Sequence, residues 1–525
     1  MITVSNLLSN VPPLFSSLAK VLSGEINCSY QAITAYSSDG SIYSVRPQAV
    51  IYPKNASDIK HVLSFAREYS MPVITRGSGT ARSGGSLGEG MILDMTKYFT
   101  HIRQINMMDH TITVDAGVSV KTLRDKLRGW NMDVPVLTSQ DDGATIGGLI
   151  STKSATPTSF HHGTIREWVE SLTVVIDTGE EHRIADGTTP SGRLLGIYQA
   201  IFPILSESGP VLRATKPNEH DDATGYCLWN TSIGPRQLLD ELVGGEGTLG
   251  IITSVTLRLA PRKTLSVTTF IPITNSSLLN SCIDISKHHK AEHIFLYDAT
   301  FTKLSELYHA HLLPKLLDTP YVLCVTHFDT DKEKLHDKLK TFIKAIPVEC
   351  GSCVQLENED KIERITEKSY IFSLLDAYTQ GSHVANTLAD GIIVSVHDYS
   401  ETLHEIDAYL ASTGRLYTIT GNAGSGHISV ISLFDTNSPT YENELGEYSK
   451  NIFTLVKKHK GGISAVGGDG LIRTPFLSYV YNEATMNIFQ NIKNAWDPLG
   501  ILNPGKKISV TTNYLREHLA RHLPL

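Results

Sequence analysis

Hydrophobic and polar residues recur along the chain with two different periods, which predict both helices and strands. Over residues 57–66 the apolar side chains repeat at helical spacing and fall on one face. Residues 111–115, Thr-Ile-Thr-Val-Asp, alternate between polar and apolar as a half-buried strand does. A helical pattern then runs from Ser119, the expected N-cap, to about Trp130. This mixture predicts small strand–helix–strand units and an α+β fold class.

The pattern changes character beyond Pro261, which is a natural domain boundary. Strand patterns at residues 321–326 and 391–396 alternate there with helical patterns at residues 331–346 and 401–411. Such alternation is typical of an α/β arrangement in which helices pack on a sheet. The sequence therefore predicts a second domain after the first.

The most informative stretch of the first part lies between two short strand patterns, residues 72–74 and 91–94. It reads RGSGTARSGG over residues 76–85. Glycines allow backbone N–H groups to turn inward and approach a ligand closely, and a concave row of N–H groups suits a diphosphate. No helix follows and no G-x-x-x-x-G-K-[ST] occurs, so neither a Rossmann unit nor a P-loop is indicated. Taken alone, the stretch is equally explained as a glycine- and serine-rich surface loop.

Three further segments complete a pattern. GATIGG occupies residues 143–148, GGEGTLGIIT occupies residues 244–253, and residues 497–506 combine Asp-Pro with ILNPGK. Together with the first loop, and in this order, they resemble the FAD-linked oxidase family of the vanillyl-alcohol oxidase/PCMH type. The branch that the chain resembles most contains the D-lactate, glycolate and D-2-hydroxyglutarate dehydrogenases. The resemblance covers about residues 34–508.

The resemblance implies a fold and a domain order. The fold would be α+β, with a PCMH-type FAD-binding domain of two α+β subdomains plus an α/β cap domain with an antiparallel sheet. Four parts are expected in the chain: a helical N-terminal lead-in over residues 1–30, the FAD-binding domain over 31–262, the cap (substrate) domain over 263–480, and a C-terminal segment over 481–525 that returns to the FAD domain.

The cofactor implied is FAD, held non-covalently, because Thr80 stands where some relatives have a histidine that bonds to the flavin. The glycines of the implied binding loops would keep Cβ atoms away from the FAD. Arg76 would add charge beside the pyrophosphate, although a structural salt bridge explains it equally well. The residues implied to bind FAD are Arg76, Gly77, Ser78, Gly79, Thr80, Ser83 and Gly84 at the pyrophosphate, Thr145, Gly147 and Gly148 at the flavin and ribityl chain, Glu246, Gly250 and Ile252 at the adenine and ribose, and Asn503.

The first catalytic signature of the 2-hydroxy acid branch is altered. Relatives of that branch carry G-H-A-G-D-G-N-x-H, in which two histidines bind a divalent metal beside the substrate. This chain reads GNAGSGHIS over residues 421–429. Asn422 and Ser429 replace the two histidines, and Ser425 replaces the aspartate. His427 stands where the family has asparagine and is a candidate base, although a histidine without a catalytic role is the simpler interpretation.

The second signature, G-G-S-x-S-G-E-H-G-x-G in the family, is altered as well. Val466 and Gly467 replace the Glu-His pair that supplies a metal ligand and the base. Because amide, hydroxyl and aliphatic side chains are poor ligands for zinc or manganese, we expect no transition metal at this site. Arg473 is a candidate anchor for a substrate carboxylate, since a guanidinium pairs with a carboxylate bidentately.

Composition and charge narrow the class of protein. The 525 residues carry a net charge of −8 and 41% hydrophobic residues, as a globular protein does, and the chain is too acidic for a typical nucleic-acid binder. No apolar run reaches the length of a membrane span, and the N-terminus lacks a basic region before its apolar residues. Of six cysteines only Cys350 and Cys353 form a C-x-x-C. We expect a protein that is cytoplasmic or peripheral to a membrane.

The function implied is that of an FAD-dependent oxidoreductase acting on CH–OH groups. It would dehydrogenate a small-molecule substrate, a 2-hydroxy acid or related hydroxy compound, by hydride transfer to flavin N5. Electrons would then pass to a separate acceptor: a partner protein, a quinone or oxygen. Because both signatures are altered, the alternative is a catalytically degenerate flavin-binding protein that acts as an electron carrier or a partner scaffold.

Overall fold

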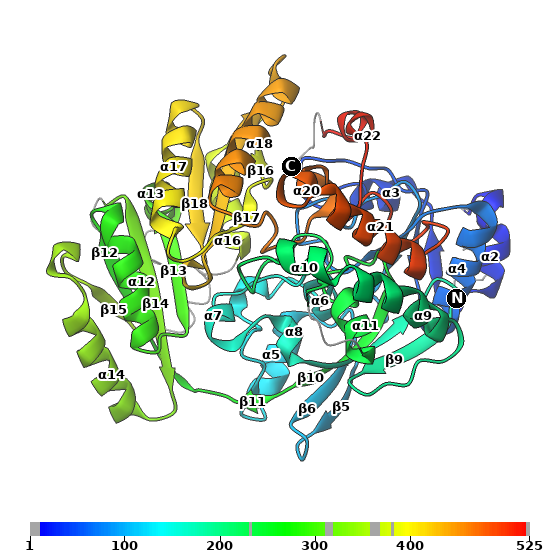
Figure 1. The fold of residues 1–525 in the computed structure, drawn as a ribbon, viewed down its shortest axis with the longest axis horizontal. Coiled ribbons are helices and arrows are strands. Elements are labelled where there is room, and N and C mark those ends of the chain that lie inside the picture. Colours follow the sequence, from blue (N-terminus) through cyan, green and yellow to red (C-terminus); the bar gives the residue numbers. More distant parts are fainter. Residues whose placement is uncertain (1–10, 230–233, 310–318, 358–367, 380–382, 521–525) are drawn as a thin grey trace.

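The computed structural model describes residues 11–229, 234–309, 319–357, 368–379 and 383–520 (Figure 1). Three main sheets organise this part of the chain: two smaller sheets in its first half and an eight-stranded sheet in its second half. The two halves lie side by side in Figure 1, with the eight-stranded sheet and its helices on the left. We call the second half the cap domain.

The first sheet has the strand order β1-β2-β4-β3, and its last three strands are parallel. Parallel neighbours need a long connection, and residues 77–90 supply it between β3 and β4 without forming a helix. The glycine-rich loop therefore starts at the carboxyl end of β3. The elements are β1 (Glu25–Asn27), α3 (Tyr30–Tyr36), β2 (Ala49–Tyr52), α4 (Ala56–Tyr69), β3 (Val73–Arg76) and β4 (Met91–Asp94).

The N-terminal lead-in was expected to be wholly helical, and this prediction is wrong in part. A short 3-10 turn (Pro13–Phe15) and α2 (Ser16–Val21) are helical, but β1 pairs antiparallel with β2 and extends the first sheet. Residues 1–10 of the lead-in lie outside the described residues. The apolar side chains Phe15 and Leu18 pack with α4, so the lead-in belongs to the core of the first subdomain.

The second sheet is antiparallel, in the order β5-β6-β10-β8-β9. Ser119 caps α5 as expected, since its hydroxyl accepts a hydrogen bond from the N–H group of Thr122. The elements are β5 (Ile102–Asn106), β6 (Thr111–Asp115), α5 (Val120–Arg128), β7 (Met132–Asp133), α6 (Ile146–Thr152), α7 (Ser159–His162), α8 (Ile165–Trp168), β8 (Val169–Val175), β9 (Glu181–Ala185), α9 (Gly192–Glu207), α10 (Gly209–Thr215), α11 (Pro235–Leu242), β10 (Ile251–Arg258) and β11 (Ala260–Pro261).

The cap sheet is antiparallel throughout, in the order β15-β12-β14-β13-β18-β19-β16, with β17 also paired to β19. Its elements are β12 (Leu265–Ile273), α12 (Leu279–His288), β13 (His293–Asp298), α13 (Ala299–His309), β14 (Tyr321–Asp329), α14 (Lys332–Ala345), β15 (Val354–Leu356), α16 (Lys368–Tyr378), β16 (His383–Asn386), β17 (Asp390–Ile393), α17 (Tyr399–Ser412), β18 (Tyr417–Gly421), β19 (His427–Asp435) and α18 (Tyr441–Lys458).

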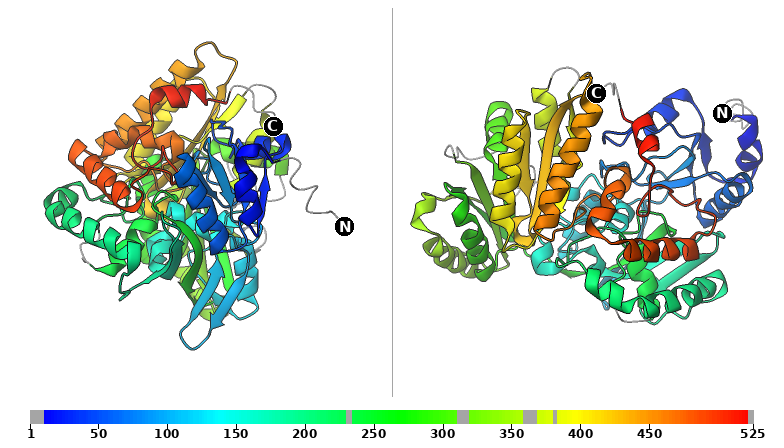
Figure 2. Two further views of the ribbon diagram at one scale, coloured as in Figure 1. Left: turned by 90° about the vertical axis from the view of Figure 1, so that its right-hand side faces the viewer. Right: turned by 45° about the horizontal axis from the view of Figure 1, so that its top comes forward.

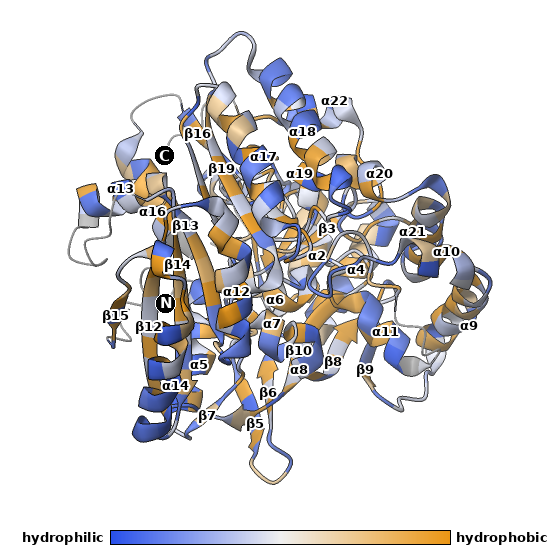
Figure 3. Ribbon diagram, turned by 60° about the vertical axis from the view of Figure 1, so that its left-hand side comes forward, coloured by the Kyte–Doolittle hydropathy of each residue, from blue (hydrophilic) through white to orange (hydrophobic). Residues whose placement is uncertain are grey.

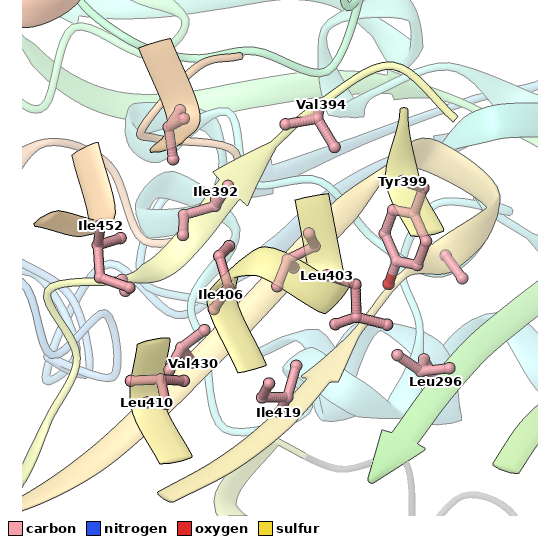
Figure 4. Packing of buried hydrophobic residues seen from close by; sticks show 14 of the residues in the cluster. Leu296, Ile392, Val394, Tyr399, Leu403, Ile406, Leu410, Ile419, Val430 and Ile452 are labelled. Atoms are coloured by element: carbon pink, nitrogen blue, oxygen red, sulfur yellow. The ribbon is translucent and has the colours of Figure 1, made fainter. Parts of the chain in front are cut away.

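Alternation along these strands gives the cap sheet two buried faces. On one face Leu296, Ile419 and Val430 pack against Leu403 and Ile406 of α17, as Figure 4 shows, and the same core extends to α12, α14 and α18. The opposite face packs against α13 and α16. In Figure 3 the cap strands are largely coloured as hydrophobic, and α14 is largely coloured as hydrophilic.

The C-terminal segment crosses from the cap back to the first half, as the right-hand view of Figure 2 shows. It contains α21 (Glu483–Trp496) and α22 (Thr512–Glu517), and it follows α19 (Gly470–Arg473) and α20 (Leu477–Val480) at the end of the cap. Leu502 forms a parallel bridge with Val73, and the N–H group of Asn503 donates to the Val73 carbonyl at 2.9 Å. The segment thereby continues the first sheet beyond β3.

The α+β fold with an antiparallel cap sheet is confirmed. No helix among the described residues combines the length and the apolar character that a membrane crossing requires.

We predict that His327 on β14 makes the cap sensitive to acid. Burial lowers the pKa of its fully enclosed ring from 6.5 to about 4, so the folded state holds it neutral. Stability is therefore complete above pH 6.5 and is lost as pH falls towards 4, by up to about 3 kcal/mol. His327→Phe, which keeps an aromatic ring against Phe342, should remove this loss in urea unfolding curves measured across that range. The exposed His336→Phe serves as the control, and equal acid sensitivity of both variants and the wild type would contradict the prediction.

Candidate functional site

One cavity of about 400 Å³ lies where the two small sheets meet the cap. This volume is typical of sites for cofactors and small molecules. The three glycine segments of the first half supply most of its wall, and Phe372, Val466 and Gly467 of the cap close one end. The predicted cofactor residues that line it are Gly77, Ser78, Gly79, Thr80, Ser83, Thr145, Gly147, Gly148, Glu246, Gly250 and Ile252.

The loop after β3 presents an uninterrupted row of backbone donors. Within the described part of the chain, no group accepts a hydrogen bond from the backbone N–H groups of residues 77–83. Three buried side-chain atoms on the cavity wall also lack a partner there: Oγ1 of Thr75, Oγ of Ser86 and Oε1 of Gln140. Buried polar groups are normally satisfied, so these donors and acceptors fit a polar, anionic ligand such as a dinucleotide.

The glycines of the cavity are required for a reason that the sequence did not give. A Cβ atom on Gly147 would lie 2.7 Å from Cβ of Ala116, and one on Gly77 would overlap the hydroxyl of Thr145. At Gly79 it would lie 2.7 Å from Nη2 of Arg76. These glycines let strands and loops of the protein approach one another. Close packing of the protein therefore explains Gly77, Gly79 and Gly147 independently of any ligand.

Arg76 has a structural role, but its partners are backbone carbonyl groups and an aromatic ring and not the carboxylate of the salt bridge that was considered. Its guanidinium donates to the carbonyl groups of Ser38, at 2.9 Å, and Tyr36, and it lies over the Tyr36 ring. Arg76 does not line the cavity, and neither does Gly84 or Asn503. Asn503 instead donates to the carbonyl groups of Gly85 and Glu246, at 2.9 and 2.7 Å, and so holds two cavity loops together. None of the three predicted contacts with the cofactor is supported by this geometry.

A buried ion cluster joins the cavity to the cap and to the C-terminus. Nζ of Lys507 lies 3.1 Å from Glu246 and 2.9 Å from Asp469, and all three side chains are buried. Burial opposes the charge of Lys507, but the two carboxylates outweigh it and raise the pKa of the ammonium. The N–H groups of Asp469 and Gly470 donate to Glu246 as well. Although Glu246 lines the cavity, its carboxylate is committed to these partners.

Arg473 cannot serve as the carboxylate anchor that the sequence suggested. The side chain is fully buried, and its five N–H donors all bind backbone carbonyl groups. These carbonyls belong to Leu388, Val466, Gly468, Thr387 and Asp390. All donors of Arg473 are therefore occupied. The side chain connects β17 to residues 466–468 and does not line the cavity.

His427 also lies away from the cavity wall. It begins β19, opposite Ile393 of β17, and is 2% exposed. Its Nδ1 accepts a hydrogen bond from the N–H group of Asn422 at 3.2 Å. In an antiparallel pair, directly opposed residues share a face, so His427 lies on the same side of the sheet as Ile393. The described geometry therefore gives His427 a place in the loop but no direct contact with the cavity.

The positions that the resemblance assigned to metal ligands are poorly suited to a metal. The Ser429 hydroxyl donates to Asp390 at 2.6 Å, and the Val466 side chain packs with Ala155 and Ile393. In the described part of the chain, the one group of three potential ligands is formed by Glu401, Glu405 and His459. That group lies on α17 and at the end of α18, outside the cavity wall.

The cavity-lining residues that were not predicted include Arg82 and Phe372. Arg82 lies in the loop after β3, and its Cζ is 3.6 Å from the centre of the Phe372 ring on α16. A lone basic residue inside a glycine- and serine-rich loop was a visible signal. The contact with Phe372, which comes from a distant part of the chain, was not. Thr145, which was expected only as a cofactor residue, also caps α6 by accepting a hydrogen bond from the N–H group of Gly148.

We predict that Lys507 stabilises the fold far more than its neighbour Lys506. Lys507→Met would leave two buried carboxylates without their cation and should lower the free energy of unfolding by about 3–5 kcal/mol. Lys506 donates to the carbonyls of Leu87 and Pro504, and burial lowers its pKa to about 7, so Lys506→Met should cost about 1–3 kcal/mol. Urea unfolding of both variants gives the comparison, and equal losses would contradict the role of the ion cluster.

Comparison with protein families identifies both halves. Residues 47–185 match the FAD binding domain, and residues 277–507 match the C-terminal domain of FAD linked oxidases. The two matched ranges contain, respectively, the loop after β3 with α6, and most of the cap with the returning C-terminal segment.

Curated relatives match along almost the whole chain at low identity. A D-2-hydroxyglutarate dehydrogenase of Pseudomonas putida is 24% identical and covers 92% of this chain, but the chain spans only 50% of that relative. A mitochondrial D-lactate dehydrogenase [cytochrome] of Kluyveromyces lactis is 23% identical, over 91% of this chain and 77% of the relative. Glycolate oxidase subunit GlcD of Bacillus subtilis is 24% identical, over 92% of each.

Solved structures show the same fold. The 4-ethylphenol oxidase of Gulosibacter chungangensis superposes with a TM-score of 0.68 at 16% identity, over 95% of this chain and 97% of the other. An alkyldihydroxyacetonephosphate synthase gives a TM-score of 0.66 at 13% identity, over 94% and 86%. The order of the glycine segments, the cavity that they enclose and both matched domains lead to one conclusion: the chain belongs to the FAD-linked oxidase family, and its cofactor is FAD.

Proposed function

We propose that the protein is an FAD-dependent dehydrogenase of a small 2-hydroxy acid or related hydroxy compound. The observation that carries the proposal is the row of unsatisfied N–H groups at residues 77–83 in a cavity whose far end is closed by the cap. The named dehydrogenases among the relatives support the substrate class. Because the chain spans about half the length of the first of them, its substrate and acceptor stand as proposals.

The residues of the cavity would hold FAD without a covalent bond. The N–H groups of Gly77–Thr80 would bind its diphosphate, and Thr145, Gly147 and Gly148 would lie along the ribityl chain and flavin. Gly250 and Ile252 would line the adenine end. Thr80 has no ring nitrogen with which to bond the flavin. Bound FAD would supply the hydride acceptor, and the cap residues Phe372 and Val466 would exclude water from that end of the cavity.

The second candidate function is that of a flavin-binding electron carrier or partner scaffold without a substrate. It is favoured by one observation: neither His427 nor Arg473 reaches the cavity wall. The acids on that wall include Asp39 and Glu246, and both already accept hydrogen bonds from backbone N–H groups. A dehydrogenase of this kind would use a base other than the family's Glu-His pair, and it would pass its electrons to a separate acceptor.

Anaerobic mixing of the FAD-loaded protein with D-lactate, glycolate and D-2-hydroxyglutarate tests the proposal. Bleaching of the flavin absorbance by at least one of these acids is the expected outcome. Because the positions of the family's metal ligands hold Asn422, Ser429 and Val466, prior treatment with EDTA should leave the reduction rate unchanged. A flavin that stays oxidised with every acid would favour the carrier or scaffold function.

Substitutions of the adjacent residues Gly147 and Gly148 should have different effects, one on the packing of the protein and the other on FAD binding. A Cβ atom on Gly148 would meet only Oγ1 of Thr145 within 4 Å, whereas one on Gly147 would collide with Ala116. The side chain introduced by Gly148→Leu should therefore project into the cavity and weaken FAD binding at least tenfold. Disturbance of the Thr145 hydroxyl, which is the N-cap of α6, should cost about 1 kcal/mol of stability. Gly147→Ala should mainly lower the melting temperature and should affect FAD affinity less than Gly148→Leu does. Flavin fluorescence titration and thermal unfolding measure both effects, and the reverse assignment of the two effects would refute the prediction.

A further inference from the structure

Arg82 stands out because it is the basic residue among those that line the cavity. The other charged lining residues, Asp39, Asp141 and Glu246, are acidic. A guanidinium keeps its charge at any physiological pH and carries five N–H donors in one plane. These donors are available to a ligand only if no group of the protein accepts hydrogen bonds from them.

Within the described residues, no hydrogen-bond acceptor or ion-pair partner is found for the Arg82 side chain. Arg473 differs in this respect, because all five of its N–H donors bind backbone carbonyl groups. Arg82 lines the cavity, whereas Arg473 does not line it and binds the Val466 carbonyl. The cavity therefore contains one positively charged fork with its hydrogen-bonding edge uncommitted.

The position of this fork is nevertheless fixed. Its Cζ lies 3.6 Å from the centre of the Phe372 ring, a cation–π contact at the short end of the usual range. Gly40 packs against the same side chain, where a Cβ atom would come within 3.4 Å of Cζ and Nε. The Arg82 carbonyl accepts a hydrogen bond from the hydroxyl of Thr387 in the cap at 2.5 Å. Contacts with carbon atoms and the backbone thus hold the guanidinium, and none of them occupies its donors.

The loop that carries Arg82 is divided between two neighbours. Gly77 lies against Thr145, which belongs to the first half of the chain. Residues 81–83 lie against the cap instead, since the Ser83 hydroxyl donates to the Gly467 carbonyl at 2.8 Å. The proposed diphosphate site therefore occupies the first part of the loop, and Arg82 faces the part of the cavity that the cap closes.

Burial is the largest influence on the pKa of Arg82 and lowers it, whereas the carboxylates of Asp376, Asp39 and Asp390 raise it. None of the three lies within ion-pair distance of the guanidinium in the described structure. Asp39 and Asp390 already accept hydrogen bonds from other groups. The guanidinium thus remains a partly desolvated cation that is available to an incoming anion.

We propose that Arg82 binds the carboxylate group of the substrate at the cap end of the cavity. A planar fork of N–H donors matches a carboxylate in two parallel hydrogen bonds and fixes its orientation. The substrate class is thereby narrowed to compounds with a carboxylate next to the oxidised carbon. This inference rests on the proposed function for its chemistry, but carboxylate binding at Arg82 is measurable without turnover.

The test uses oxalate as a probe that cannot be oxidised by hydride transfer from a CH–OH group. FAD-loaded wild type, Arg82→Gln and Arg82→Lys are titrated with oxalate, and the change in flavin absorbance gives the Kd. Arg82→Gln should weaken oxalate binding roughly 10- to 100-fold, and Arg82→Lys should fall between, because it keeps the charge but loses the fork. Arg46→Gln is the matched control, since Arg46 also lies over an aromatic ring, that of Tyr30, but on the surface.

Affinity for FAD is measured in parallel and should be unchanged in Arg82→Lys. Three results would overturn the inference: wild type that does not bind oxalate, Arg82→Gln that binds it as tightly as wild type, or variants that lose FAD affinity while the loaded fraction binds oxalate normally. Reduction by the three hydroxy acids is scored separately. If the hydroxy acids reduce the flavin equally well in the wild type and in the Arg82 variants, this inference is wrong and the proposed function stands. If oxalate binding depends on Arg82 but no acid reduces the flavin, carboxylate binding at Arg82 stands and the proposed function is wrong.

Discussion

The architecture depends on placing one buried cation, Lys507, between two buried carboxylates from different parts of the chain. Glu246 comes from the loop before β10, and Asp469 comes from the segment that leaves the cap. A charge in such surroundings is tolerated only when it is paired and hydrogen-bonded, so the three segments must meet in one arrangement. Lys507 adds hydrogen bonds to the carbonyls of Ala223 and Gly225. The same interaction therefore closes the fold and positions the cavity wall.

Much of the fold could be predicted because its signals are local. The period of the apolar residues predicted α4, and the alternation of residues 111–115 predicted β6. The failures arise where tertiary contacts decide. Residues 25–27 have no strong strand pattern, and they form β1 because β2 offers an open edge. The start of α6 after Thr145 was not predicted, because Gly147 and Gly148 are poor helix formers.

The candidate site was predictable in its loops and unpredictable in its polar contacts. Glycine segments identify themselves in a sequence, and most of the implied residues do line one cavity. Whether an arginine serves a ligand or the backbone depends on which carbonyl groups surround it, and no sequence pattern contains that information. Arg473 lies in a suggestive segment, yet β17 and residues 466–468 consume its donors. Arg82 lies in a loop that was assigned to the cofactor, and contacts with Phe372 and Thr387 from distant parts of the chain place it at the cap.

The altered signatures do not by themselves indicate a decayed site. Asn422 is fully buried, and neither its Oδ1 nor its Nδ2 has a hydrogen-bond partner among the described residues; the same is true of Oγ of Ser425. Each such atom costs about 1–3 kcal/mol, a penalty that an apolar side chain of similar size would avoid. Gly424 between them approaches Phe160 of α7 so closely that a Cβ atom would overlap the ring. These polar atoms lie in the loop that packs against Phe160 of the first half, so the altered signature presents unused hydrogen-bonding groups where the two halves of the protein meet.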